Sequence, residues 1–279
     1  MLLSLACFTV NALLIKHCSS VRQIDPWLSV GIRFGVGLVM TVIFFAPSGE
    51  LNMRRSFSSW LLASRGVLGA VATAALYFSI GPLGAGKAML ISNTWCVWAA
   101  IMAAIVLHER LSLTKLLGIV IAIGGLELLT GVSQDMLSHN GQWEAISLVG
   151  AVLAAMVVVV IRQLTKTETS ATIFASQCLY GLLLAIPFAA KHIVHLTAMD
   201  YVLMTVAGLC AGVGQLAMTE GFRFLTVAAG GAFQITLPLL ISVGGIFFFD
   251  EHFSLMQAMG GLLILFGSFQ TVVGIRWRR

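Results

Sequence analysis

Ten long apolar segments dominate the sequence and constrain its fold more than any other feature. They lie at about residues 2–15, 27–46, 60–80, 86–106, 113–131, 144–161, 172–190, 200–219, 225–249 and 254–275. A helix crosses the hydrocarbon core of a bilayer with about 20 apolar residues. Only 10% of the residues are charged, whereas soluble domains carry roughly 25%. We therefore predict an all-α integral membrane protein with ten transmembrane helices.

The basic residues between these segments predict the orientation of the chain. With both termini in the cytoplasm, the inner loops and tail hold Arg54, Arg55, Arg110, Lys115, Arg162, Lys166, Arg223, Arg276, Arg278 and Arg279. The outer loops then hold only Lys16, Arg22, Lys87 and Lys191. Cytoplasmic loops of membrane proteins carry such an excess of Lys and Arg. We therefore predict that both termini are cytoplasmic.

One stretch of sequence occurs twice. LHERLSLTKLLGIVIAIGGLELLTG begins at Leu107, and FDEHFSLMQAMGGLLILFGSFQTVV begins 142 residues later at Phe249. At this offset the matching pairs include Thr94/Thr236, Glu109/Glu251, Ser112/Ser254, Gly118/Gly260 and Gly125/Gly267. Each half contains five predicted spans, an odd number, so the second half enters the membrane from the opposite side. We predict two inverted five-helix repeats, residues 1–132 and 141–279, as in many secondary transporters.

The repeated stretch contains residues that fit helix starts and tight turns. Ser112 and Ser254 can cap the fifth and tenth helices, and Gln257 would complete a capping box in the second copy. Glu109 and Glu251 would lie near the positive ends of those two helices. We interpret the two serines and the two glutamates as structural turn and helix-cap residues. Direct contact with a substrate is the less favoured alternative.

This pattern resembles the EamA-type proteins of the drug/metabolite transporter superfamily. The resemblance rests on Glu109, Glu251, Gly118, Gly125, Gly260, Gly267, Arg33 and Pro238 within GGAFQITLPLL. It implies a carrier of small organic solutes in the cell inner membrane, often an exporter, that works without ATP hydrolysis. The stretch GQLAMTEGFRF is also similar to subgroups proposed to carry nucleotide-like or adenosyl compounds. Cys96 stands where the ninth helix has Pro238, so we expect a proline kink only in the second half.

Polar residues in the apolar segments are candidates for a substrate cavity. In inverted-repeat transporters the binding site lies near the midplane of the bilayer, at the interface of the repeats. The main candidates are Ser92, Asn93, Thr94, Trp95, Trp98, Gln234 and Thr236, and further candidates are Asn11, Tyr77, Gln215 and Thr219. Any one of these side chains could instead bridge neighbouring helices by a hydrogen bond. For the cluster as a whole, we favour a cavity.

Charged residues inside predicted spans are functional candidates by default. Arg33 and Glu127 could pair with each other, bind a charged solute or respond to a proton. Alternatively, Arg33 extends outward to the surface and Glu127 reaches water at the end of its helix. Arg65 and the Glu220/Arg223 pair lie near the cytoplasmic face, where extension to water and an ion pair within one helix explain them.

The sequence contains no motif of a membrane enzyme. GxSxG, HExxH and glycine-rich phosphate loops are absent, so we expect no catalytic residue, metal or cofactor. We predict a secondary transporter that exports amino-acid-like metabolites or drugs by alternating access. The alternatives are an uptake permease for a nucleotide-like or adenosyl metabolite and, in another class, a channel or non-transporting scaffold. The expected partners are a small-molecule substrate and the lipid bilayer, with proton coupling and oligomeric state left open and no nucleic acid.

Overall fold

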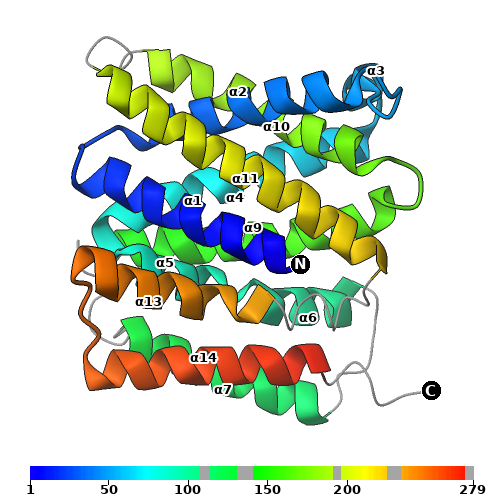
Figure 1. The fold of residues 1–279 in the computed structure, drawn as a ribbon. Coiled ribbons are helices and arrows are strands. Elements are labelled where there is room, and N and C mark those ends of the chain that lie inside the picture. The colour runs from blue at the N-terminus through cyan, green and yellow to red at the C-terminus, as the bar shows by residue number, and fades with distance from the viewer. Residues whose placement is uncertain (107–112, 131–140, 191–195, 225–233, 274–279) are drawn as a thin grey trace.

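The computed structural model describes residues 1–106, 113–130, 141–190, 196–224 and 234–273. In these ranges the chain is α-helical and contains no strand. The longer helices run roughly parallel to one another, with their connections at the two ends of the bundle (Figure 1). They are α1 (Leu2–Ser20), α2 (Pro26–Phe45), α3 (Met53–Ser58), α4 (Trp60–Leu83), α5 (Ala85–Ser92), α6 (Trp95–Val106), α7 (Leu113–Thr130), α9 (Gln142–Leu164), α10 (Ser170–Ala189), α11 (Ala198–Phe224), α13 (Leu237–Phe249) and α14 (Leu255–Val273).

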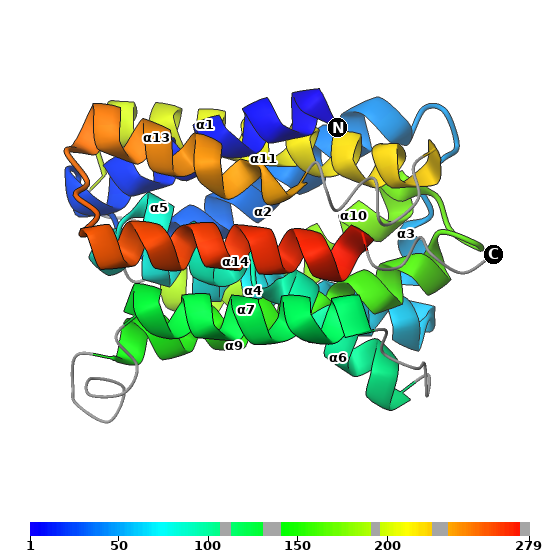
Figure 2. The ribbon, with the colours of Figure 1, turned by 90° about the horizontal axis from the view of Figure 1, so that it is seen from below.

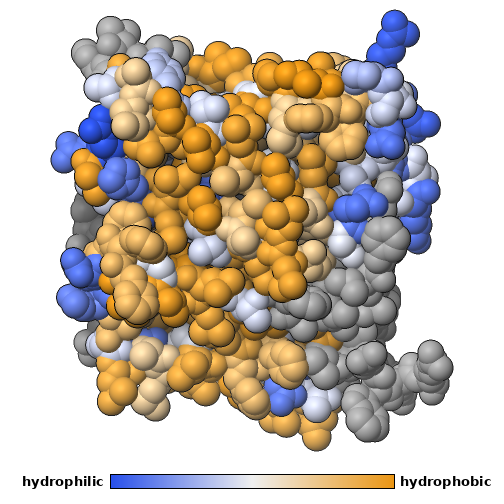
Figure 3. Space-filling model, viewed as in Figure 1, coloured by the Kyte–Doolittle hydropathy of each residue, from blue (hydrophilic) through white to orange (hydrophobic). Residues whose placement is uncertain are grey.

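The molecular surface carries a wide apolar belt. In Figure 3, hydrophobic residues cover the middle of the molecule, and hydrophilic residues gather at the two edges where the helices end. Large apolar side chains are exposed, among them Phe247 at 78% and Phe248 at 75% near the end of α13. Within the described ranges, seven helices are long and apolar enough to cross a membrane, and α13 is a shorter apolar helix. The chain is therefore an all-α membrane protein, as the sequence predicts.

Helices from the two halves of the chain pack against each other throughout the bundle. α4 packs against α9, α1 against α11, and α2 against α10. α5 packs against α13, and α7 lies beside α14 along most of its length, as Figures 1 and 2 both show. Each of these pairs joins a helix before residue 132 to one after residue 140. The core of the protein is therefore largely the interface between its two halves.

Four glycines allow α7 and α14 to approach closely. A Cβ atom added at Gly118 would lie 2.8 Å from the Gly267 carbonyl oxygen. One added at Gly125 would lie 2.7 Å from the Gly260 carbonyl oxygen. The neighbouring backbone leaves no room for a side chain at these positions, so small residues set the distance between the two helices. The seven-residue spacing of the glycines in the sequence predicts this close approach.

The fourth predicted span is interrupted in the middle. α5 ends at Ser92, α6 begins at Trp95, and the two residues between them form a turn. The Thr94 hydroxyl donates to the Ile91 carbonyl oxygen at 2.7 Å, which stabilises the turn. A second turn stands at Thr236, directly before α13 and 142 residues after Thr94. The first break forms without a proline, so the chain bends in both halves and not only where a proline is present.

Part of the ninth predicted span, residues 225–233, lies outside the described residues. Pro238 occupies the first turn of α13, where its missing N–H group has no intrahelical partner to lose. α1 and α4 each extend a few residues beyond the predicted ends, to Ser20 and Leu83. The short helix α3 is the one described element that the apolar pattern does not predict, because it lies in a polar connection.

Candidate functional site

A cavity of about 220 Å³ lies between α4, α6, α9, α10 and α11. One wall is apolar and comes mainly from α9, and the other walls carry polar groups. The described lining residues are Arg65, Gly69, Ala72, Thr73, Trp95, Ala154, Val157, Val158, Ile161, Thr165, Gln177, Gln215, Met218 and Gln234. Thr165 directly follows the last residue of α9. The cavity therefore extends toward the membrane face at which α4 begins and α9 ends.

Arg65 is the charged group of this cavity. Its side chain is buried at 2% exposure, and its Nη2 donates a hydrogen bond to Gln177 Oε1 at 2.8 Å. Its Nε and Nη1 atoms are buried and have no hydrogen-bond partner among the described residues. No acidic residue is among the described residues of the lining. No described lining residue therefore balances the positive charge of Arg65, and an unpaired buried charge is costly.

A glycine one helical turn later gives Arg65 its position. A Cβ atom at Gly69 would collide with Arg65 Nη1 and would lie 3.0 Å from Gln177 Nε2. The guanidinium group therefore lies across its own helix in the space that the missing side chain leaves. The expectation that Arg65 extends to water at the membrane face is wrong. The glycine at i+4 permits this placement, but Arg33 and Gly37 have the same spacing, so the sequence pattern alone does not identify the cavity arginine.

Three residues proposed from the sequence line the cavity. Gln215 and Gln234 are each 7% exposed, and Trp95 faces the same space from the start of α6. The Gln234 Nε2 atom is buried without a hydrogen-bond partner among the described residues. Gln177 of α10 was not among the sequence candidates, although it joins the two glutamines and Arg65 in the lining. Amide groups from three helical segments thus line the same cavity as one guanidinium group.

The other eight cavity candidates lie outside the described lining: Asn11, Tyr77, Ser92, Asn93, Thr94, Trp98, Thr219 and Thr236. Trp98 Nε1 donates to the Thr94 hydroxyl at 3.2 Å, so these two side chains hold the start of α6. The Thr219 hydroxyl donates to the Gln215 carbonyl oxygen at 2.8 Å. Asn93 is buried, and its Nδ2 lacks a hydrogen-bond partner among the described residues. Thr236 is exposed at the turn before α13.

Asn11, Tyr77 and Arg33 form a second buried polar cluster. Arg33 Nη1 donates to the Tyr77 hydroxyl at 2.9 Å, and that hydroxyl lies 3.1 Å from Asn11 Oδ1, to which it donates. Asn11 Nδ2 donates to the Ala207 carbonyl oxygen at 2.9 Å. The cluster connects α1, α2, α4 and α11. An Arg33–Glu127 pair does not form, because Arg33 turns to Tyr77 and Glu127 is exposed on α7.

Glu251 and Lys16 hold the junction between α4 and α5. Glu251 Oε1 accepts a hydrogen bond from the Ala85 amide at 2.6 Å, at the first turn of α5. Lys16 Nζ donates to the Gly81 carbonyl oxygen at 3.0 Å and lies 3.8 Å from Glu251 Oε1. The negative Glu251 carboxylate thus lies at the N-terminus of α5, and the positive Lys16 ammonium lies at the C-terminus of α4. The helix dipoles favour both placements. Between them Gly84 has a positive φ of 87°, which favours glycine.

Glu251 therefore acts on a helix other than the expected one, because its carboxylate caps α5 and not α14. Ser254 and Gln257 cap α14 instead. The backbone N–H of Gln257 donates to Ser254 Oγ at 3.2 Å, and the backbone N–H of Ser254 donates to Gln257 Oε1 at 3.0 Å. These are the reciprocal bonds of a capping box. Glu109 and Ser112 of the first copy lie outside the described residues.

Two further ion pairs join helices near the same membrane face as Glu251. Lys87 Nζ lies 2.8 Å from Glu144 Oε1, which connects α5 to the first turn of α9. Arg22 Nε donates to Asp200 Oδ1 at 2.6 Å, which connects the turn after α1 to α11. The hydrogen bond and the negative charge of Asp200 raise the pKa of the Arg22 guanidinium above its ordinary value. The helices are therefore tied together on the face opposite to the one that the cavity approaches.

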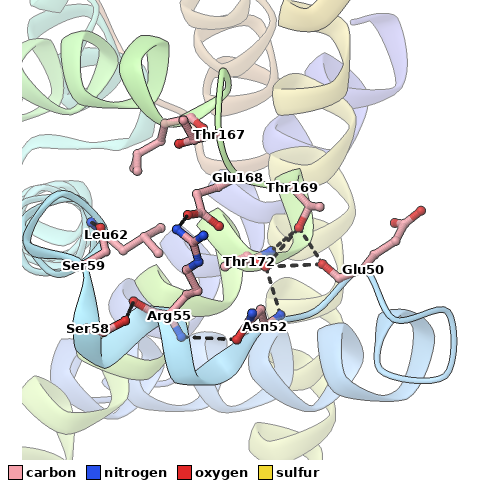
Figure 4. Close-up of polar contacts among 11 residues, drawn as sticks. Glu50, Asn52, Arg55, Ser58, Ser59, Leu62, Thr167, Glu168, Thr169 and Thr172 are labelled. Atoms are coloured by element: carbon pink, nitrogen blue, oxygen red, sulfur yellow. Dashed lines mark hydrogen bonds and ion pairs between the residues drawn. The ribbon is translucent and has the colours of Figure 1, made fainter.

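On the cavity side, a polar cluster ties α3 and its preceding segment to the start of α10 (Figure 4). Arg55 Nη1 lies 2.8 Å from Glu168 Oε1. The Thr169 hydroxyl donates to the Glu50 backbone carbonyl oxygen at 2.6 Å. The backbone N–H of Asn52 donates to Thr172 Oγ1 at 3.1 Å. The cluster begins three residues after the cavity residue Thr165, so it lies at the end of the bundle where α9 ends.

Comparison with known proteins places these features in a wider group. The model of the EamA-like transporter family matches residues 1–131 and 142–273. Among solved structures 27 chains match, and one described only as "Crystal structure of protein" has a TM-score of 0.69 at 16% sequence identity. That match covers 99% of this chain and 98% of the other, and it shows similarity of fold alone. No curated protein matches the chain.

Proposed function

Because the chain belongs to the EamA-like transporter family, we propose that it is a secondary transporter that binds small organic solutes in the cavity beside Arg65. The observation that carries this proposal is a cavity whose polar groups have unused hydrogen-bonding capacity. Arg65 and Gln234 both present buried nitrogen atoms without partners among the described residues. A solute that accepts hydrogen bonds from these groups would satisfy them. No step in this mechanism uses ATP.

We further propose that the ten spans form two inverted repeats, residues 1–132 and 141–279. On this proposal α5 and α6 make one interrupted span, and α13 is the second part of another. The pairing of helices across the two halves supports it, as do the corresponding turns at Thr94 and Thr236. Discontinuous helices at the middle of the membrane are typical of transporters built in this way.

With both termini in the cytoplasm, the cavity extends toward the cytoplasmic face, because α4 begins and α9 ends there. Solute would then load from the cytoplasm in this conformation, which favours export. The hydrogen bond to Glu251 and the ion pairs of Lys87 and Arg22 would hold the helices together at the outer face and close it. Alternating access would exchange these contacts for an open outer face and a closed inner one.

The size of the cavity distinguishes between classes of solute. Its volume is about 220 Å³, below the roughly 300–1,000 Å³ of pockets for drug-sized ligands. We therefore favour small metabolites over drugs and over the nucleotide-like or adenosyl compounds of the alternative proposal. An uptake permease for those larger compounds would need a wider cavity than this conformation offers.

A comparison of all metabolites in cells and medium, with and without the protein, would identify the solute and the direction of transport. Purified protein in proteoliposomes should then show saturable flux and counterflow of that solute. A channel would conduct without counterflow, and a scaffold would give no flux, so either result contradicts the proposal.

We expect Gln234→Ala to lower the initial rate of transport by about 2- to 10-fold, because it removes one neutral hydrogen bond to the solute. The matched control is Gln163→Ala, since Gln163 is an exposed residue of α9. Expression and thermal stability of both variants should equal those of the unmodified protein. Unchanged kinetics in Gln234→Ala would remove this residue from the binding site.

A further inference from the structure

We propose that Arg65 binds a carboxylate group of the transported solute and that the substrates are small organic acids with a single negative charge. This inference rests on the proposed transport function and adds the chemical class of the solute. It starts from a guanidinium group that is 98% buried, borders a cavity and donates only one hydrogen bond among the described residues.

Two nitrogen atoms of the Arg65 side chain are buried and keep unused hydrogen-bonding capacity. Gln177 Oε1 accepts from Nη2, and this contact together with the space at Gly69 holds the guanidinium group in one place. Nε and Nη1 remain without partners in the described part of the chain. Arginine forms strong charge-assisted hydrogen bonds with carboxylates. A held guanidinium group with unused donors is therefore a preorganised site for such a group.

The balance of charge selects among anions. Arg65 is the one charged residue in the described lining of the cavity. A monocarboxylate neutralises it, whereas a phosphate monoester carries about −1.5 to −2 at neutral pH and would leave excess negative charge. A zwitterionic amino acid or an uncharged solute would leave the positive charge of Arg65 uncompensated. Burial makes each such imbalance unfavourable, so a solute with one net negative charge fits best.

The rest of the lining indicates the shape of the solute. Gln215 and Gln234 offer amide groups that donate and accept hydrogen bonds. Trp95 and the apolar side chains of α9, such as Val157 and Ile161, offer a surface for a short carbon chain. The volume of about 220 Å³ limits the length of that chain. A short aliphatic acid with a hydroxyl or carbonyl substituent matches these features.

The test uses the purified full-length protein and short monocarboxylates, each paired with its uncharged primary amide. Lactate with lactamide is one such pair, and alanine and glycerol 3-phosphate represent the zwitterion and the phosphate monoester. Thermal stabilisation and competition for counterflow are measured for every compound. We expect monocarboxylates to act at concentrations at least about tenfold lower than their amides. Equal action of acids and amides, stronger action of alanine or glycerol 3-phosphate, or no action of any monocarboxylate would overturn the inference.

Variants of Arg65 test whether this residue makes the distinction. Arg65→Gln should weaken the action of monocarboxylates by about 30-fold or more and remove their advantage over amides. Arg65→Lys should retain part of that advantage, because it keeps the charge but not the fixed planar donors. Arg54→Gln is the matched control, since it removes an equal charge from an exposed position of α3. An unaltered preference for acids in Arg65→Gln would contradict the proposal.

The two proposals can fail separately. If the metabolite comparison finds a transported solute without a carboxylate group, the assignment of Arg65 is wrong and the transport function stands. If the reconstituted protein moves no solute at all, the transport function is wrong and the inference falls with it.

Discussion

Arg33 and Arg65 occupy similar positions in the sequence and play different parts in the structure. Each lies in an apolar helix, each is almost fully buried, and each is followed by a glycine one turn later, Gly37 or Gly69. Arg33 donates to the Tyr77 hydroxyl and has no nitrogen that is both buried and without a partner in the described structure. Arg65 has two such nitrogens and faces a cavity.

The difference shows which observations mark a binding site. Charge and burial inside a membrane are the same for both residues, so neither property distinguishes them. The cluster around Arg33 uses its hydrogen bonds to connect four helices, which is a structural role. Only Arg65 both lines the cavity and has buried nitrogen atoms without hydrogen-bond partners among the described residues. We therefore assign stability to the first arginine and ligand binding to the second, and three predictions follow from that division.

The largest effect is expected for Gly69→Ala. The new methyl group would displace the Arg65 guanidinium from its place on α4, and the loss of its hydrogen bonds to solute would lower the rate of transport by about 10- to 100-fold. Counterflow in proteoliposomes measures this rate. The matched variant Gly37→Ala meets Cys178 Sγ and Phe174 instead, so it should lower thermal stability and leave the affinity for solute unchanged. Transport at the normal rate in Gly69→Ala would contradict the assignment of ligand binding to Arg65 and of stability to Arg33.

A smaller effect is expected for Tyr77→Phe, which removes the acceptor of the Arg33 hydrogen bond. A buried donor left without a partner costs about 1–3 kcal/mol, so the free energy of unfolding should fall by about 2 kcal/mol. Denaturant unfolding in detergent micelles measures the change. The affinity for solute should stay within about threefold, because Tyr77 is not among the cavity residues. Loss of solute affinity at unchanged stability would assign the Arg33 cluster to binding as well.

The smallest effect is expected for the stability of Arg65→Gln without solute. Because the unmodified protein bears an uncompensated charge at this position, its replacement should leave the free energy of unfolding unchanged or raise it by about 1 kcal/mol. The same measurement on Arg33→Gln should show a decrease. A marked loss of stability in Arg65→Gln would indicate that Arg65 is a structural residue like Arg33.

Features that depend on nearby residues could be predicted from the sequence. The glycine spacing that sets the distance between α7 and α14 follows from helix periodicity. The pair Ser254 and Gln257 is three residues apart, so its hydrogen bonds follow from the geometry of a helix start. The repeat of 142 residues directed attention to Gln234, and the search for polar residues in apolar segments found Gln215 and Trp95, all of which line the cavity.

Contacts between distant residues could not be predicted in this way. Arg65 and Gln177 are 112 residues apart, and Glu251 reaches an amide 166 residues earlier in the chain. Contacts over such sequence separations produce no short-range sequence pattern. The position of Arg65 near the predicted cytoplasmic face suggested instead that its side chain extends to water. Whether a polar residue faces a cavity or a neighbouring helix depends on packing that a single helix does not specify, as Asn11 and Gln215 illustrate.

The junction at Gly84 has a mechanical consequence. The Glu251 carboxylate binds the start of α5, and the Lys16 ammonium binds the end of α4, on the two sides of the junction at Gly84. Sliding α13 away from that junction would strain these short contacts at once, since they share the same few atoms. These contacts would therefore break together and not one after another, so this end of the bundle would adopt one of two discrete conformations.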